Sequence, residues 1–192
     1  MYDTGIQSVW YRWFGELTVT SDTAAEPDTL DVIEVATAML MRNFELLRRR
    51  GTGVGELDRA DYLLLRTLSA IGPSDIVGLA AALGLDPSTA GRQVSAMAAK
   101  GLIERNPSPT DKRRSVISPT KTGLARMRTT RTARRRLAGE MLADWPEADL
   151  RTLGEMFTRY NRTVAAHFLL GEDERSEPPA ATVLDALLPA GS

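Results

Sequence analysis

The chain of 192 residues contains no cysteine, and its one histidine is His167. Without thiols there can be no disulfide, no thiolate metal site and no cysteine nucleophile, and one imidazole cannot build a multi-histidine zinc site. No apolar run approaches the ~20 residues of a membrane span, and the N-terminus lacks the basic start and apolar stretch of a secretory signal. These absences predict a cytoplasmic protein without a membrane segment or a bound metal.

Groups that carry catalysis are also scarce. The sequence has no phosphate-binding glycine loop, no cluster of metal ligands and no plausible base beside a nucleophile. The carboxylates of Glu140, Glu147 and Glu155 are scattered over segments that have the pattern of structural helices. We therefore expect a protein that is not an enzyme and that needs no cofactor.

Charge is unevenly distributed, although the formal net charge is only −1. Residues 74–136 contain thirteen basic and four acidic side chains, whereas the flanking segments 1–73 and 137–192 are both acidic on balance. A basic middle between acidic ends is typical of a chain in which one module binds a polyanion.

Apolar periodicity predicts a mainly α-helical chain. Helices are expected over residues 29–50, 59–71, 75–83, 87–100, 121–144 and 147–170, with short amphipathic helices over 5–17 and 180–188. Asp58, Ser74 and Thr120 are the expected N-terminal caps, and Pro87 suits a first helical position. Four side chains of the second long segment are expected to face a core: Leu64, Leu65, Leu68 and Ile71.

Residues 102–118 have the pattern of a β-hairpin. Short strands over 102–105 and 115–117 flank the segment Asn106-Pro107-Ser108-Pro109, which is expected to be a turn because prolines interrupt regular structure. The tip carries Asp111, Lys112, Arg113 and Arg114. Three cations on a turn suit DNA, because a narrow minor groove has an enhanced negative potential that attracts arginine. Asp111 is expected to accept hydrogen bonds in the turn and to hold Arg113 in position.

Residues 75–118 place two short helices, a tight turn at Gly84 and this hairpin in succession. In the second helix Ala90, Val94 and Met97 share one face, and the other face carries Ser88, Arg92 and Ser95. Short hydroxyls and an arginine on an exposed face suit base edges and phosphates in a major groove. An ordinary surface helix has the same pattern, so the neighbouring basic hairpin decides in favour of DNA.

The sequence resembles the multiple-antibiotic-resistance regulator (MarR) family over about residues 29–170. The matching segments are LDRADYLLLRTL (57–68), LAAALGL (79–85), DPSTAGRQV (86–94), KGLIER (100–105), DKRR (111–114) and SPTKTG (118–123). The Asp-x-Arg wing followed by Thr-x-x-Gly is the most specific part of the likeness. Pro119 stands where the family more often has an apolar residue, and the N-terminal segment lies outside the common pattern.

The resemblance implies a winged helix-turn-helix fold, mainly α with a small β-hairpin wing, joined to a helical dimerisation domain. It implies a homodimeric transcriptional regulator, a repressor released by a small-molecule effector, that binds a pseudo-palindromic operator in double-stranded DNA. The recognition-helix contacts would be Ser88, Thr89, Arg92 and Gln93, and the wing-tip pair Asp111 and Arg113. The expected organisation is an arm and linker (1–28), a dimerisation helix (29–56), a DNA-binding domain (57–120), two dimerisation helices (121–170) and an acidic tail (171–192).

The aromatic N-terminal arm is similar to an added first helix in the urate-responsive branch of the same family. Trp10 would match the ligand-binding tryptophan of that branch, and Arg92 and Arg105 its two arginines. Its aspartate is not matched, because Leu63 occupies that place. We prefer packing across the dimer as the role of the arm. The alternative for the whole chain is a winged-helix module that binds protein without specific DNA binding, against which the basic wing argues.

Overall fold

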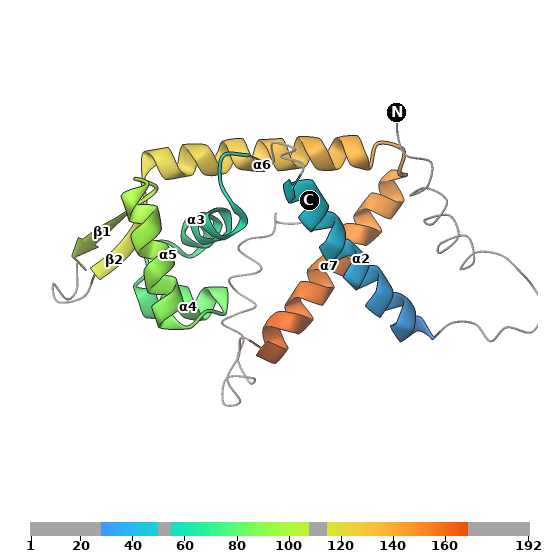
Figure 1. Cartoon of the computed structure of the whole chain (residues 1–192), viewed down its shortest axis with the longest axis horizontal. Helices are drawn as coiled ribbons and strands as arrows, with labels where there is room; N and C mark the ends of the chain where they lie inside the picture. Colours follow the sequence, from blue (N-terminus) through green and yellow to red (C-terminus); the bar gives the residue numbers. More distant parts are fainter. Residues whose placement is uncertain (1–27, 50–54, 108–114, 169–192) are drawn as a thin grey trace, which may run out of the picture. The chain divides into compact units, whose positions relative to one another are not determined.

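The computed structural model describes residues 28–49, 55–107 and 115–168, and this part of the chain is mainly α-helical with one small hairpin (Figure 1). The elements in order are α2 (Thr29–Arg49), α3 (Arg59–Ile71), α4 (Ile76–Leu83), α5 (Pro87–Ala99), β1 (Ile103–Pro107), β2 (Ser115–Pro119), α6 (Lys121–Met141) and α7 (Glu147–Phe168). The fold class expected from the sequence is confirmed. The helices expected over 5–17 and 180–188 lie outside the described residues. Among the helices that the structure describes, none is long and apolar enough to cross a membrane.

The chain divides after Arg50 into two units, and α2 belongs to the first. In the second unit, α3 packs against α4, α5, α6 and β2 and so lies at the centre of the core. The largest fully buried apolar side chains are Leu64, Leu65, Leu68, Leu79, Val94, Met97, Leu102 and Ile117. Burial of such a side chain contributes about 1.5–3 kcal/mol, so this core fixes α5 and the hairpin firmly against α3. Ile71, expected to face inward, is instead 36% exposed, because it is the last residue of α3.

Helix starts follow local side-chain chemistry, with one exception. The Asp58 side chain accepts a hydrogen bond from the Asp61 N–H, and Thr120 accepts one from the Gly123 N–H, so both expected caps are confirmed. The expected cap Ser74 is wrong, and Asp75 caps α4 by accepting from the Gly78 N–H. The reason is tertiary: the Ser74 backbone pairs with Ile117 of β2 in an isolated antiparallel bridge, which moves the start of the helix by one residue.

The hairpin is longer than the sequence suggested. Asn106 and Pro107, expected in the turn, are the last residues of β1 and pair with Val116 and Ser115. Within the described residues the sheet has two strands, so β1 has one open edge, where a proline without an N–H is tolerated. The expected turn is therefore wrong for these two residues.

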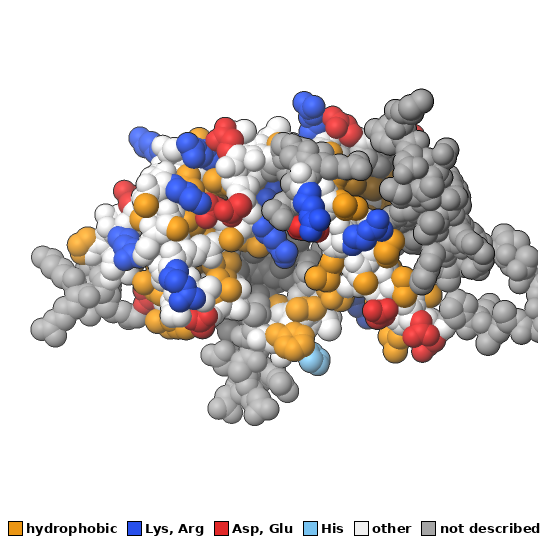
Figure 2. Space-filling view, in the orientation of Figure 1, with side chains coloured by type: hydrophobic (Ala, Val, Ile, Leu, Met, Phe, Trp, Pro, Cys, Tyr) orange, Lys and Arg blue, Asp and Glu red, His pale blue; other side chains and the backbone are white. Residues whose placement is uncertain are grey.

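The two long flanking helices expose apolar side chains. On α2 these include Leu30, Ile33, Met41 and Phe44, and on α7 they include Met156, Phe157, Tyr160 and Phe168. Figure 2 shows hydrophobic side chains at the surface of both helices. Isolated surface apolar residues are common, but repeated ones along one helix are typical of an interface. These side chains are exposed, whereas Leu64, Leu65 and Leu68 of α3 are buried.

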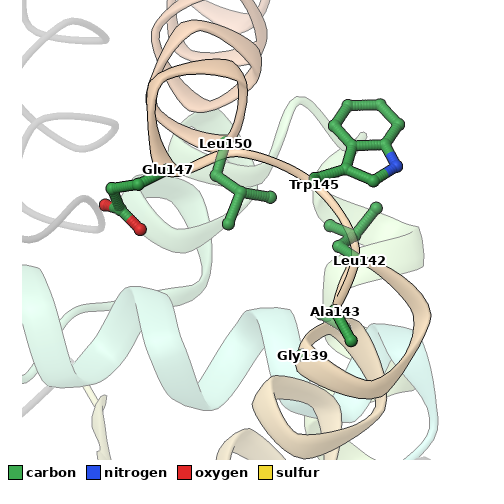
Figure 3. A pocket seen from close by; sticks show the side chains of 7 residues that line it. Gly139, Leu142, Ala143, Trp145, Glu147 and Leu150 are labelled. Atoms are coloured by element: carbon green, nitrogen blue, oxygen red, sulfur yellow. The ribbon is translucent and has the colours of Figure 1, made fainter.

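The corner between α6 and α7 differs from the expected one. We expected α6 to reach residue 144, but it ends at Met141, and the Trp145 N–H donates to the Leu142 carbonyl in the turn that follows. A pocket of about 450 Å³ opens at this corner, lined by Ala138, Gly139, Leu142, Ala143, Trp145, Glu147 and Leu150 (Figure 3). Figure 3 places Leu150 between Glu147 and Trp145, and Leu142 next to Trp145. The lining is mostly apolar, so this corner is a further uncovered apolar surface.

Candidate nucleic-acid interface

Helix α5 has two distinct faces, as the sequence predicted. Ala90, Val94 and Met97 are completely buried. The opposite face carries the exposed side chains of Ser88, Arg92 and Ser95. The helix is therefore held by its apolar face, and its polar face is open to a partner.

The start of α5 is organised by Asp86. One carboxylate oxygen, Oδ1, accepts hydrogen bonds from the Thr89 N–H at 2.9 Å and from the Ser88 hydroxyl at 2.5 Å. Hydrogen bonds from the Ser88 and Thr89 side chains hold the pKa of Asp86 well below its ordinary value. Asp86 is therefore ionised at neutral pH, and its charge is favourable beside the N-terminus of a helix.

Arg92 lies along the same polar face. Its Nη2 donates to Thr89 Oγ1 at 2.8 Å, and its Nη1 lies 3.5 Å from Ser88 Oγ. Three of the four predicted recognition residues thus form one connected surface, and the fourth, Gln93, is half-buried beside it. The structure presents a guanidinium that is already oriented by two hydroxyls.

A second arginine joins this face from the hairpin. Arg105 of β1 donates from Nη2 to the Ser95 hydroxyl at 2.9 Å, and Ser95 in turn donates to the Gly91 carbonyl. The sequence had suggested Arg105 as a ligand-binding residue, together with Arg92 and Trp10, and both arginines also have simpler explanations in DNA binding or in the fold. Periodicity could not reveal this contact, because Arg105 lies on a strand and Ser95 on a helix.

An ion pair that the sequence did not predict fastens the other end of α5. Lys100 Nζ lies 2.6 Å from Asp61 Oδ2 and 3.9 Å from Asp58 Oδ2. The Asp61 side chain is 7% exposed and that of Lys100 is 48% exposed. The hydrogen bond to Asp61 raises the pKa of Lys100 above its ordinary value. The pair therefore joins the first turn of α3 to the end of α5.

The contact between α3 and α6 contains polar groups that lack partners. The Arg134 guanidinium lies over the Tyr62 ring, with Cζ 4.1 Å from its centroid, a cation–π arrangement. Burial lowers the pKa of Arg134. Within the described residues, Thr130 Oγ1 and Arg134 Nε are buried side-chain atoms without a hydrogen-bond partner. Such groups are rare in proteins, since each is costly to bury.

Several predicted site residues lie outside the described part of the chain. They are Trp10 and the wing-tip residues Asp111, Lys112, Arg113 and Arg114. The strands that lead into the wing are described, and they place its two ends at Pro107 and Ser115, which are paired. In the described residues there is no cluster of three or more histidine or acidic side chains that could hold a metal ion.

Solved structures share this architecture. A MarR family protein from Bacillus stearothermophilus superposes with a TM-score of 0.61 at 16% identity, covering 74% of this chain and 99% of that one. The PcaV transcriptional regulator from Streptomyces coelicolor, solved in complex with its natural ligand, gives a TM-score of 0.53 at 22% identity and covers 77% of this chain and 99% of that one. At these identities the likeness concerns the fold.

The sequence comparisons go further. The MarR family model matches residues 57–115, the segment from the start of α3 to the start of β2. The uncharacterized HTH-type transcriptional regulator YxaD of Bacillus subtilis (strain 168) is 33% identical over 133 residues, which are 69% of this chain and 93% of that protein. The chain belongs to the MarR family of DNA-binding, winged-helix transcriptional regulators.

Proposed function

We propose that this regulator is a homodimer that binds a pseudo-palindromic operator sequence-specifically and represses transcription until a small molecule releases it. The observation that carries the proposal is the polar face of α5. This face is exposed, and neighbouring hydroxyls orient its arginine. The opposite, apolar face of α5 is buried and fixes the helix in the core. This is the arrangement of a recognition helix, whose N-terminal residues contact base edges in the major groove.

The recognition residues divide into two roles. Arg92 has five donors in a planar fork, and such a fork can bind O6 and N7 of one guanine together. Ser88, Thr89 and Gln93 add short donors and acceptors for bases or phosphates. The wing residues Asp111, Lys112, Arg113 and Arg114 lie between β1 and β2 in the sequence. Their role in the proposal is to bind the adjacent minor groove mainly through charge.

Dimer formation is supported by the apolar side chains on α2 and α7. Both rows are exposed in the described part of the chain, and pairing two copies through them would remove both from water. A two-fold dimer would present its two α5 helices to half-sites about one DNA turn apart, ~34–36 Å from centre to centre. The operator would then have the same two-fold symmetry as the protein.

Release by a small molecule is supported by two observations. PcaV, which has the same fold, was solved with its natural ligand. In this chain, the seam between α3 and α6 holds a buried hydroxyl and a guanidinium nitrogen without partners, so polar groups are available to an effector. The residues first suggested for the effector, Trp10, Arg92 and Arg105, remain part of the proposal.

The experiment that tests the proposal starts with purified full-length protein. Duplexes selected from a random pool are sequenced, and affinity for the enriched sequence and for a scrambled duplex is measured at several salt concentrations. We expect a two-fold-symmetric sequence, a dimer in sedimentation equilibrium, and a loss of discrimination in Arg92→Ala. Arg151→Ala, which removes an exposed arginine from α7, is the matched control and should discriminate like the wild type. Equal affinity for all duplexes, or a stable monomer at micromolar concentration, would refute the proposal.

A further inference from the structure

Arg105 occupies an unusual place for a strand residue. Its backbone belongs to β1, where it pairs with Ile117 of β2. Its guanidinium ends on the polar face of α5, against the Ser95 hydroxyl. Helix α5 and strand β1 pack against each other, so the contact is supported by the fold as well as by one hydrogen bond. The polar face of the recognition helix therefore carries a cation that the helix itself does not supply.

We propose that Arg105 is a DNA-contacting residue that binds a backbone phosphate at the C-terminal half of α5, and that Ser95 positions it there. The proposal rests on the proposed function, since it requires α5 to lie in the major groove. It adds a contact outside the recognition-helix and wing-tip residues already named.

The hydrogen-bonding capacity of the Arg105–Ser95 pair supports a contact with phosphate. A guanidinium has five N–H donors, and the contact with Ser95 uses one. The Ser95 hydroxyl accepts from Arg105 and donates its one proton to the Gly91 carbonyl, so it is held from both sides. The remaining donors of Arg105 belong to an exposed side chain. A planar fork held at one corner is well suited to a tetrahedral anion, which accepts two parallel N–H bonds.

The surroundings of Arg105 leave its charge available. Glu104, the preceding residue, has its Oε1 3.5 Å from the Ser118 hydroxyl of β2, across the hairpin. In the described part of the chain no carboxylate forms an ion pair with Arg105. The guanidinium is therefore a full positive charge at the surface, next to the helix that faces DNA.

The spacing of the two anchored arginines favours a second contact. Arg92 is anchored on Thr89 and Arg105 on Ser95, six residues later. Six residues of α-helix rise about 9 Å, so the two guanidinium groups are anchored at different heights along α5. Gly91 lies between them, and a Cβ added there would have no neighbour within 4 Å. A DNA backbone can therefore approach α5 closely between the two cations.

The test compares five variants of the full-length protein, Ser95→Ala among them, on the selected operator and on an unrelated duplex. Arg105→Gln keeps a donor for Ser95 and removes the charge, and Arg105→Ala removes both. Arg105→Lys keeps the charge without the fork. Arg128→Ala removes an exposed arginine from α6 and is the control. Affinity is measured as a function of salt, and thermal melting verifies that each variant is folded.

A phosphate contact changes the salt dependence in a defined way. In Arg105→Gln and Arg105→Ala, the negative slope of log K against log salt should become shallower by about 0.9, and affinity should decrease similarly on both duplexes. Arg105→Lys should keep the wild-type slope. Ser95→Ala should also keep the slope while binding more weakly, because the charge remains but is no longer positioned.

Different outcomes distinguish this inference from the proposed function. If the wild type and Arg128→Ala bind with salt dependence and Arg105→Gln has an unchanged slope, Arg105 does not contact phosphate and the inference is refuted. A change of base preference without a change of slope would also refute it, since that result indicates a base contact. If the wild type itself shows no salt-dependent binding, the proposed function fails, and this inference fails with it.

Discussion

Replacing Lys100 by methionine should lower the free energy of unfolding by about 1–3 kcal/mol. The ammonium group lies 2.6 Å from Asp61 Oδ2, and methionine keeps the apolar stem while removing the charge. The carboxylate of Asp61, whose side chain is 7% exposed, would then lose its hydrogen-bonded counter-ion. The loss would loosen the joint between α3 and the end of the recognition helix.

The magnitude follows from the unequal burial of the two partners. Exposed ion pairs are worth ~0–1 kcal/mol, and removing one partner of a fully buried pair costs ~3–5 kcal/mol. Here the carboxylate is buried, but the lysine side chain is 48% exposed, so water partly replaces the lost contact. The expected effect therefore lies between the two limits.

Urea denaturation at pH 7 and at pH 9 measures this effect. A raised folded-state pKa means that the lysine contributes its full stabilisation below its ordinary pKa of about 10.4 and loses it as the pH rises through the folded value. The difference between wild type and Lys100→Met should thus be the same at both pH values. Lys121→Met, which removes the exposed lysine at the start of α6, is the control and should change stability by less than ~0.5 kcal/mol.

A second variant separates the pair from other effects of the substitution. Adding Asp61→Asn to Lys100→Met removes the buried charge and should restore much of the lost stability. If Lys100→Met unfolds at the same urea concentration as the wild type, or if the double variant is no more stable than the single one, the reasoning about the buried carboxylate is refuted.

Three further substitutions test the packing around the recognition helix. Gly91→Ala should stabilise the protein by about 0.5–1 kcal/mol in a thermal melt, because the added methyl group contacts no other atom. The same variant should bind DNA more weakly, because the methyl group fills the surface between Arg92 and Arg105. Unchanged DNA affinity would show that the DNA backbone does not approach this surface closely. Gly123→Ala should destabilise by more than ~2 kcal/mol in urea titration, since its Cβ would collide with the Leu102 carbonyl oxygen, and a stable variant would mean that α6 can shift. Thr130→Val should be neutral or stabilising by up to ~1 kcal/mol, because it removes a buried hydroxyl without a partner, and a marked loss of stability would reveal a hydrogen bond at that hydroxyl.

The parts of the fold that sequence reasoning predicted well depend on short-range interactions. A cap joins a side chain to an N–H three residues later, as Asp58 does with Asp61 and Thr120 with Gly123. The buried face of α5 follows from helical spacing alone, because Ala90, Val94 and Met97 must lie on one side. Such features are visible in a single stretch of sequence.

The parts that were missed depend on residues far apart along the chain. Ser74 is not a cap because its backbone pairs with Ile117, and nothing near Ser74 reveals that strand. Lys100 and Asp61 are 39 residues apart. The polar side chains of α5 were predicted, but the anchoring of Arg105 on Ser95 requires the hairpin to be placed against the helix. Local patterns therefore predicted the candidate surface, whereas the contacts that hold it in place, Lys100 with Asp61 and Arg105 with Ser95, are seen only in the three-dimensional structure.

The junction at Thr120 determines how movement would travel through this protein. Its hydroxyl donates to the Gly101 carbonyl at 2.7 Å and accepts from the Gly123 N–H, while its N–H donates to the Leu102 carbonyl. Thr120 thus joins the end of the recognition helix, the start of β1 and the start of α6. Gly123 packs so closely against the Leu102 carbonyl that a side chain at position 123 would not fit. We therefore expect a rotation of α6 to move the C-terminal end of α5 and the hairpin with it, because the hydrogen bonds at Thr120 join all three.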